Sequence, residues 1–282
     1  MSQDTKELKL AVLIDADNVP YSNVKGMMEE IAKYGTPTTK RIYADWTKPN
    51  AGGWKSVLLE HAITPIQQYS YTVGKNSSDS AMIIDAMDLL YSDKVDGFCI
   101  VSSDSDFTRL AIRLRESGMK VIGIGEKKTP NSFIVACDRF IYIEVLDGAI
   151  KKTLKTNTRQ NKLQKTTSNP ATSSKKNPDS INNEPAILKE TPNKIDSQTI
   201  ELIEDTLDAI GDEDGWAFLG DVGNLIVKKK PEFDPRNYGF SKLTPMLKSL
   251  TDILEIDERE SDKKGIKHVF VRLRYSQENI LK

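Results

Sequence analysis

The sequence has few of the residues that build zinc sites or disulfide frameworks. It contains two cysteines, Cys99 and Cys137, and two histidines, His61 and His268, in 282 residues. The cysteines form no CxxC pair, and no cluster of cysteine and histidine with zinc-ligand spacing is present. Each cysteine lies in an apolar stretch, so we expect two buried thiols, kept reduced in a cytoplasmic protein.

Long apolar runs and an excess of one charge are also missing. The 40 lysine and arginine residues nearly balance 41 acidic residues, which leaves a net charge of −1. Attraction to a polyanionic partner would therefore have to come from local patches rather than from the whole molecule. No stretch resembles a signal peptide or a membrane-spanning helix, so we expect a soluble intracellular chain with no membrane partner.

Residues 1–150 alternate short apolar runs with segments of helical periodicity, such as Asp79–Tyr91 and Asp106–Glu116. The runs expected to form strands are Leu10–Ile14, Thr39–Ala44, Thr64–Gln68, Phe98–Val101, Val121–Ile124 and Phe140–Val145. Strands that alternate with helices are typical of a mostly parallel sheet covered on both faces. The pattern predicts an α/β, Rossmann-like first domain.

Residues 151–194 have a different composition, rich in Lys, Thr, Ser, Asn and Pro. Ten residues are basic and three are acidic, which gives a local net charge of +7. A segment with so few large apolar side chains cannot bury enough surface to offset the entropy lost on ordering. We expect a disordered basic linker, either a plain spacer or a segment that contacts phosphates.

The region 195–282 shows the pattern of a small second domain. Ser197–Ile210 is an amphipathic helix, and Trp216–Val227 and Phe240–Leu250 have the character of two more. Ile253–Asp257 and His268–Leu273 alternate like the strands of a hairpin. Three helices and a two-stranded wing predict a winged helix-turn-helix domain.

Aspartates follow two of the expected strands directly. Asp15 comes after the first strand, and Asp104 and Asp106 come just after the fourth. Asp79 stands at the start of a helix that opens toward the same edge, where parallel sheets bind ligands. Crowded carboxylates repel one another unless a cation is present, and oxygen ligands favour Mg²⁺ or Mn²⁺. Such ions activate water and stabilise charge on a phosphodiester undergoing cleavage.

Helix capping is the competing interpretation of these acids, and it would account for Asp79 or Asp106 taken alone. Asp85 is expected to be a buried partner or a residue that supports the metal ligands, rather than a ligand itself, and Lys75 is a candidate for holding a phosphate. The segment Asp15–Val19 also fits the first motif of haloacid-dehalogenase-like phosphatases, with Asp15 as nucleophile and Asp17 as acid or base. That mechanism needs an acidic pair after a later strand, and none follows.

Three motifs resemble NYN domains of the LabA/DUF88 type in the PIN-like nuclease superfamily. They are IDADNV at 14–19, GKNSSDSAMIIDAMDLLY at 74–91 and IVSSDSDFTRLAIRLRESGMKVIGIG at 100–125. The resemblance implies a ribonuclease that needs Mg²⁺ or Mn²⁺. In-line attack by a metal-activated water, with a 3′ oxygen leaving, would leave a 5′ phosphate. The residues that match its acidic and polar motif positions are Asp15, Asn18, Asp79, Asp104 and Asp106, with Ser102 and Ser103 close to the metal and the RNA. A domain that binds RNA or another protein without cleaving is the alternative.

The second domain is similar to the OST-HTH/LOTUS domain, which is associated with RNA binding. The matching segments are GWAFLGDVGNLIVKKKPEFDPRNYGFSKLTPMLKSL at 215–250 and HVFVRLR at 268–274. Lys228, Lys229 and Lys230 form its best basic patch for RNA, although a protein partner for this domain is also open. The expected core residues are Trp216, Leu219, Val222, Tyr238, Phe240 and Leu243.

Overall fold

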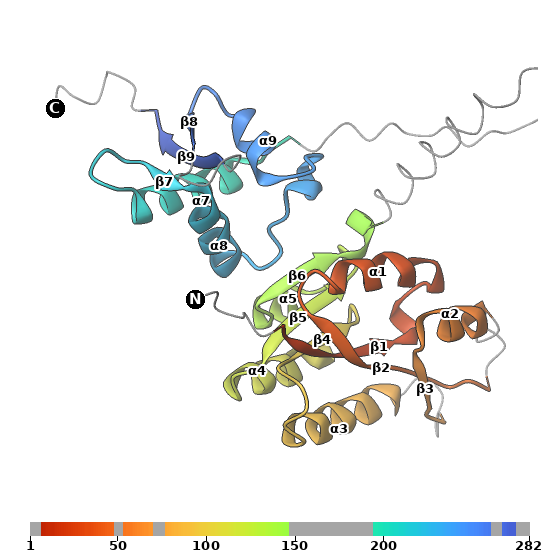
Figure 1. Ribbon diagram of the computed structural model, residues 1–282. Coiled ribbons are helices and arrows are strands. Elements are labelled where there is room, and N and C mark those ends of the chain that lie inside the picture. The colour runs from red at the N-terminus through yellow and green to blue at the C-terminus, as the bar shows by residue number, and fades with distance from the viewer. Residues whose placement is uncertain (1–6, 48–52, 70–76, 147–193, 261–266, 275–282) are drawn as a thin grey trace, which may run out of the picture.

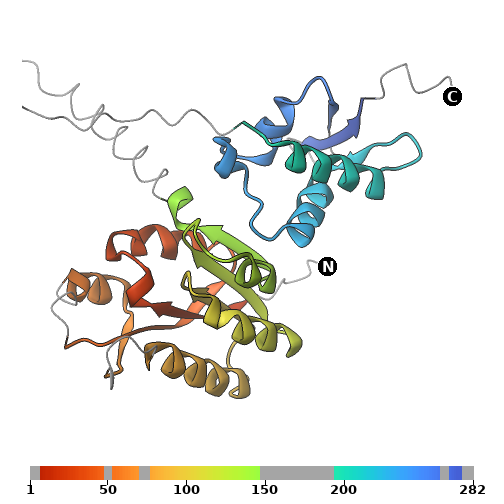
Figure 2. The same ribbon diagram turned by 180° about the vertical axis from the view of Figure 1, so that it is seen from behind.

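The computed structural model describes residues 7–47, 53–69, 77–146, 194–260 and 267–274, which form two compact parts (Figure 1). The expected linker 151–194 lies outside the described residues except for Lys194, and Lys75 also lies outside them. Figure 2 shows the same two parts from behind, with the second part beside the edge of the first.

The first part is built on a six-stranded sheet in the order β3-β2-β1-β4-β5-β6. All neighbouring strands are parallel, which confirms the predicted α/β class. The strands are β1 Lys9–Asp15, β2 Thr36–Ala44, β3 Thr64–Gln67, β4 Gly97–Val101, β5 Lys120–Gly125 and β6 Arg139–Tyr142. The chain order reverses between β1 and β4, so their carboxyl ends flank the crevice where such sheets bind ligands.

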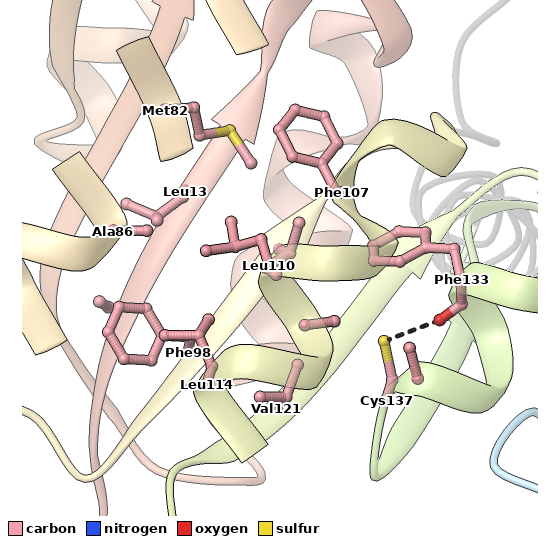
Figure 3. Close-up of a cluster of buried hydrophobic side chains, with 14 of the residues drawn as sticks. Leu13, Met82, Ala86, Phe98, Phe107, Leu110, Leu114, Val121, Phe133 and Cys137 are labelled. Carbon is pink, nitrogen blue, oxygen red and sulfur yellow. Dashed lines mark hydrogen bonds between the residues drawn. The ribbon is translucent and has the colours of Figure 1, made fainter. Parts of the chain in front are cut away.

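Helices cover both faces of this sheet. They are α1 Val24–Ile31, α2 Trp54–His61, α3 Ser77–Tyr91, α4 Thr108–Glu116 and α5 Asn131–Ala136. Leu13 of β1 packs with residues of α3, α4 and α5 on one face (Figure 3), whereas its neighbours Val12 and Ile14 pack with α1 and α2 on the other. Cys99 and Cys137 are buried and free, as predicted. None of the described helices has the length and apolar character to cross a membrane.

The second part combines helices with a small antiparallel sheet in the order β7-β9-β8. Its elements are α7 Ser197–Ile210, β7 Ala217–Phe218, α8 Leu219–Lys229, a short 3₁₀ turn at Pro235–Tyr238, α9 Leu243–Lys248, β8 Leu254–Glu260 and β9 Lys267–Leu273. Val222, Ile226, Met246 and Val271 are fully buried in its core. The predicted first helix and the hairpin are confirmed.

Three expectations for this part need correction. The helix predicted from Trp216 begins at Leu219, because β7 pairs with β9 and adds a third strand to the sheet. The helix predicted over Phe240–Leu250 spans only Leu243–Lys248. Trp216 lies outside the core: the guanidinium groups of Arg259 and Arg272 lie 5.2 and 4.5 Å from its ring centroid. Guanidinium groups stack readily on aromatic rings at a sheet surface. The prediction of Trp216 as a core residue, which was based on hydrophobicity alone, was therefore wrong.

Charged residues join the two parts. The guanidinium of Arg236 donates to both carboxylate oxygens of Glu30 at 2.8 Å, and it also binds Asp234 at 2.7 Å. Arg139 of β6 lies 3.3 Å from the carboxylate of the same Asp234. In addition, the backbone N–H of Phe140 donates to Pro231 O at 3.0 Å, so the edge strand β6 gains a backbone partner. The second part is therefore seated on β6 and α1 (Figure 1).

Candidate metal centre

Two aspartates end adjacent strands in the same way. β1 and β4 are neighbours, with Ile14 opposite Val101, so the residues that follow them emerge side by side. Asp15 Oδ1 accepts a hydrogen bond from the N–H of Asp17 at 3.1 Å, and Asp104 Oδ1 accepts one from the N–H of Asp106 at 2.9 Å. Each aspartate thus caps a single 3₁₀ turn. Asp15 and Asp104 therefore do act as caps, and the same hydrogen bonds hold both carboxylates at the carboxyl edge of the sheet.

A third aspartate completes an acidic cluster at this edge. Asp79 lies in the first turn of α3, and Asp79, Asp104 and Asp106 each offer a carboxylate oxygen within 4.8 Å of the others. That separation is roughly twice the metal–oxygen distance of about 2.0–2.6 Å for Mg²⁺ or Ca²⁺. Asp79 is buried, Asp104 half-buried and Asp106 exposed, so the cluster opens to solvent on one side. These three residues could share one divalent cation.

The electrostatics of Asp79 fit that interpretation. Burial and the negative charges of Asp15, Asp104 and Asp106 raise the pKa of Asp79 from 3.8 to about 6. Placing a cation among these carboxylates would offset both the repulsion and the lost hydration. A donor set made only of carboxylate oxygens suits Mg²⁺ or Mn²⁺ better than a softer metal.

Asp15 has a different environment from the other three. It is only 2% exposed, and burial raises the pKa of its carboxyl, although hydrogen bonds from Asn18 and Ser102 oppose the rise. The Ser102 hydroxyl donates to Asp15 Oδ2 at 3.0 Å, and the Asn18 amide donates to the same oxygen. Asp15 is not one of the three whose oxygens lie within 4.8 Å of one another. It nevertheless exerts the largest single charge effect on the pKa of Asp79.

The two buried serines after β4 hold in place the turn that carries Asp104 and Asp106. Ser102 Oγ accepts the N–H of Asp104 at 3.1 Å, which links this turn to Asp15. Ser103 Oγ accepts the N–H of Glu126 at 2.9 Å, which links it to the loop after β5. Both serines are buried, and Ser102 is not exposed at all. Their hydroxyls therefore position the aspartates, whereas the sequence suggested contact with substrate.

The remaining candidates lie away from the cluster. Asp85 is half-buried and accepts hydrogen bonds from Arg41 and from the Tyr43 hydroxyl, so it ties α3 to β2. Lys228 and Lys229 are exposed at the end of α8, and Lys230 is half-buried at the junction with the first part. Sequence reasoning missed Lys127, although a lysine two residues after β5 belongs on the same edge as the acidic cluster.

The raised pKa of Asp79 predicts that the acidic cluster lowers the stability of the fold when no metal is bound. The folded protein holds this proton more tightly than the unfolded chain, so metal-free protein should lose stability as pH rises from about 4 to 6. Asp79→Asn should then be more stable than wild type at pH 7 without metal, by on the order of 2 kcal/mol. Urea unfolding at pH 4 and 7 would measure this.

The matched control for this stability measurement is Asp88→Asn, which makes the same chemical change at an exposed position of the same helix. It should leave the pH profile unchanged, and Mg²⁺ or Mn²⁺ should stabilise the wild type more than Asp79→Asn. Equal stability of wild type and Asp79→Asn at pH 7 without metal would contradict the crowding of these carboxylates.

Solved structures from three bacteria resemble parts of the chain. A protein of unknown function from Vibrio parahaemolyticus is 21% identical, with a TM-score of 0.43 over 50% of this chain and 96% of that one. An uncharacterised protein from Nitrosomonas europaea is 28% identical, with a TM-score of 0.28 over 36% of this chain and 94% of that one. A fragment from Chromobacterium violaceum is 34% identical, with a TM-score of 0.24 over 30% of this chain and 90% of that one.

No curated protein matches the chain. Two family models do match it: the NYN domain over residues 9–144 and the OST-HTH/LOTUS domain over residues 190–266. The first match spans the parallel sheet and the acidic cluster, and the second spans α7 to β8. Both resemblances predicted from sequence motifs are confirmed. The chain therefore contains an NYN domain, a type found in the PIN-like nuclease superfamily, followed by an OST-HTH/LOTUS domain.

Proposed function

We propose that this protein hydrolyses RNA phosphodiester bonds with the help of Mg²⁺ or Mn²⁺ held by Asp79, Asp104 and Asp106. The observation that carries the proposal is the convergence of these three carboxylates at the carboxyl edge of the sheet, in an NYN domain. The OST-HTH/LOTUS domain on the same chain supports RNA as the substrate. The cluster opens to solvent on the side of Asp106, which leaves room for a polymer to approach.

The residues of the chain have separable tasks in this proposal. A divalent cation at the cluster would act as a Lewis acid that stabilises negative charge on the scissile phosphate. The buried Asp79, the half-buried Asp104 and the exposed Asp106 would hold the cation. Asp15 adds negative charge behind the site, and Asn18 and Ser102 keep its carboxylate in place. Ser102 and Ser103 fix the backbone that carries Asp104.

The phosphatase alternative fits this geometry less well. A nucleophilic aspartate must reach a substrate, but Asp15 is almost fully buried. Its carboxylate already accepts hydrogen bonds from Asp17, Asn18 and Ser102. The acids that converge are instead Asp79, Asp104 and Asp106. The site therefore supports a metal-assisted reaction better than a covalent phosphoryl-aspartate mechanism.

The proposed activity predicts cleavage that depends strictly on a divalent cation. Purified protein should cut end-labelled single-stranded RNA when Mn²⁺ or Mg²⁺ is present, and EDTA should stop cleavage until excess metal is restored. Mapping of product ends should show 5′ phosphates. A folded protein that binds RNA but cleaves none of several RNAs with either metal would favour the non-catalytic RNA-binding alternative.

A further inference from the structure

A cleft lies along the junction of the two domains. Its volume is about 490 Å³, and its walls include Lys127, Lys194 and Lys230 together with Tyr142 and Tyr238. The lysines come from three separate segments: the loop after β5, the residues before α7, and the end of α8. Only the seating of the OST-HTH/LOTUS domain on β6 and α1 brings them together. The cleft is therefore a product of the assembled chain rather than of either domain.

The cleft presents more positive than negative groups. Its acidic residues are Asp196 and Glu232, against three lysines. The Asp196 carboxylate is committed to capping α7, where it accepts from the Thr199 N–H at 2.8 Å and from the Thr199 hydroxyl at 3.1 Å. The three lysine ammonium groups therefore outnumber the remaining carboxylate of the lining, that of Glu232. Lysines from separate segments that face one cleft suit a chain of phosphates better than a single small anion.

The aromatic walls of the cleft are held rigidly. The Tyr142 ring packs edge-on against Phe140 with centroids 5.5 Å apart, and the Tyr238 ring lies 6.4 Å from that of Phe233. The Tyr238 hydroxyl also shares a 2.7 Å hydrogen bond with the Thr199 hydroxyl. Lysines interleaved with fixed aromatic rings are the combination that single-stranded nucleic acid binds, because bases stack while phosphates pair with cations.

The loop that carries Lys127 is joined by a hydrogen bond to the turn that carries the acidic cluster. Ser103, the residue before Asp104, accepts the N–H of Glu126, the residue before Lys127. Lys127 in turn donates its backbone N–H to Glu144 Oε1 at 2.9 Å, which holds this loop in place. Since consecutive Cα atoms are about 3.8 Å apart, the backbone of Lys127 is only a few residues from that of Asp104 through this contact. The cleft wall formed by Lys127 and the acidic turn at Asp104 are therefore neighbours in the fold.

We infer that this cleft binds the phosphate backbone of single-stranded RNA, next to the phosphodiester that lies at the acidic cluster. Lys127, Lys194 and Lys230 pair with successive phosphates, and Tyr142 and Tyr238 form the walls against which bases pack. The inference rests on the proposed ribonuclease function for its choice of ligand. It also gives the OST-HTH/LOTUS domain a definite task, since that domain supplies two of the three lysines.

The test compares two sets of three lysines in RNA binding. In an Asp104→Asn background, which keeps RNA uncut, the cleft set is Lys127→Gln, Lys194→Gln and Lys230→Gln. The matched control set is Lys25→Gln, Lys94→Gln and Lys242→Gln, which removes as much charge from exposed positions outside the cleft lining. Fluorescence anisotropy of a labelled single-stranded oligouridylate measures Kd over a range of salt. X-ray scattering checks that both sets keep the domains seated.

The cleft set should bind RNA about tenfold more weakly, with a salt slope smaller by about 2, because three phosphate contacts are lost. The control set should stay within about twofold of the parent. Equal losses in both sets, or no loss in the cleft set, would overturn the inference. Lys127→Gln alone, which leaves the OST-HTH/LOTUS domain untouched, should still weaken binding. RNA affinity is measured here without cleavage. A failure of the wild-type protein to cleave RNA would therefore refute the proposed ribonuclease function, but it would not change the measured role of the cleft lysines in RNA binding.

Discussion

Replacing Asp104 by Asn is expected to reduce RNA cleavage by roughly a thousandfold or more, while the protein remains folded. Asp104 offers one of the three oxygens that lie within 4.8 Å of one another, and an amide oxygen lacks the charge that a divalent cation needs. The amide oxygen introduced by the substitution can still accept the N–H of Asp106, so the local turn should survive. Initial rates with saturating Mn²⁺ would measure the loss.

Asp88→Asn is the matched control for this prediction, because it makes the same change at an exposed position of α3. It should leave the cleavage rate within about twofold of wild type. Calorimetric titration should show weaker Mn²⁺ binding by the Asp104 variant and unchanged binding by the Asp88 variant. Full activity of Asp104→Asn would remove this residue from the catalytic site and overturn the assignment of the cluster.

Reversing the charge of Arg236 should separate the two domains. Arg236 is the residue that binds Glu30 of the NYN domain through two hydrogen bonds of 2.8 Å. The Glu30 side chain is 4% exposed and that of Arg236 is 24% exposed, so both charges are largely shielded from water in the seated form. Losing one partner of such a pair costs on the order of 3 kcal/mol. This free energy corresponds to a change of more than about a hundredfold in the equilibrium constant between seated and released domains. X-ray scattering should show a larger radius of gyration for Arg236→Glu.

Two further variants make this prediction specific. Arg236→Lys keeps the charge but not the fork of donors, so it should release the domain partially. Arg274→Glu places the same charge reversal at an exposed position at the end of β9, and its scattering should match that of wild type. A compact Arg236→Glu protein would show that the ion pairs do not hold the domains together.

The same contact predicts that acid also releases the domain. Burial raises the pKa of Glu30, but hydrogen bonds from Arg236 and Lys33 more than offset this and lower the pKa below its ordinary value of 4.5. A carboxyl with a depressed pKa stabilises the state in which it is paired, and this contribution is lost as pH falls through that pKa. Seating should therefore persist at neutral pH and weaken only as pH falls below the ordinary glutamate pKa of 4.5, where scattering can follow it.

The candidate site was largely predictable because it depends on local rules. A buried parallel strand must end at the edge of the sheet, so aspartates that directly follow two strands can be placed at that edge from sequence alone. This reasoning found Asp104, Asp106 and, from the start of its helix, Asp79. It did not separate Asp15 from them, because the hydrogen bonds from Ser102 and Asn18 that occupy Asp15 depend on how adjacent turns pack.

The parallel α/β fold, the two domains and the edge where the acidic residues gather could be predicted from the sequence, because hydrophobic periodicity and strand ends are properties of short segments. Three features follow from tertiary packing instead: the set of carboxylates that converge, the position of Trp216 under two arginines, and the pairing of Glu30 with Arg236. Those features join residues far apart in the chain, some more than two hundred positions. Their partners are chosen by geometry and by the need to satisfy buried charge, and no local pattern records that choice.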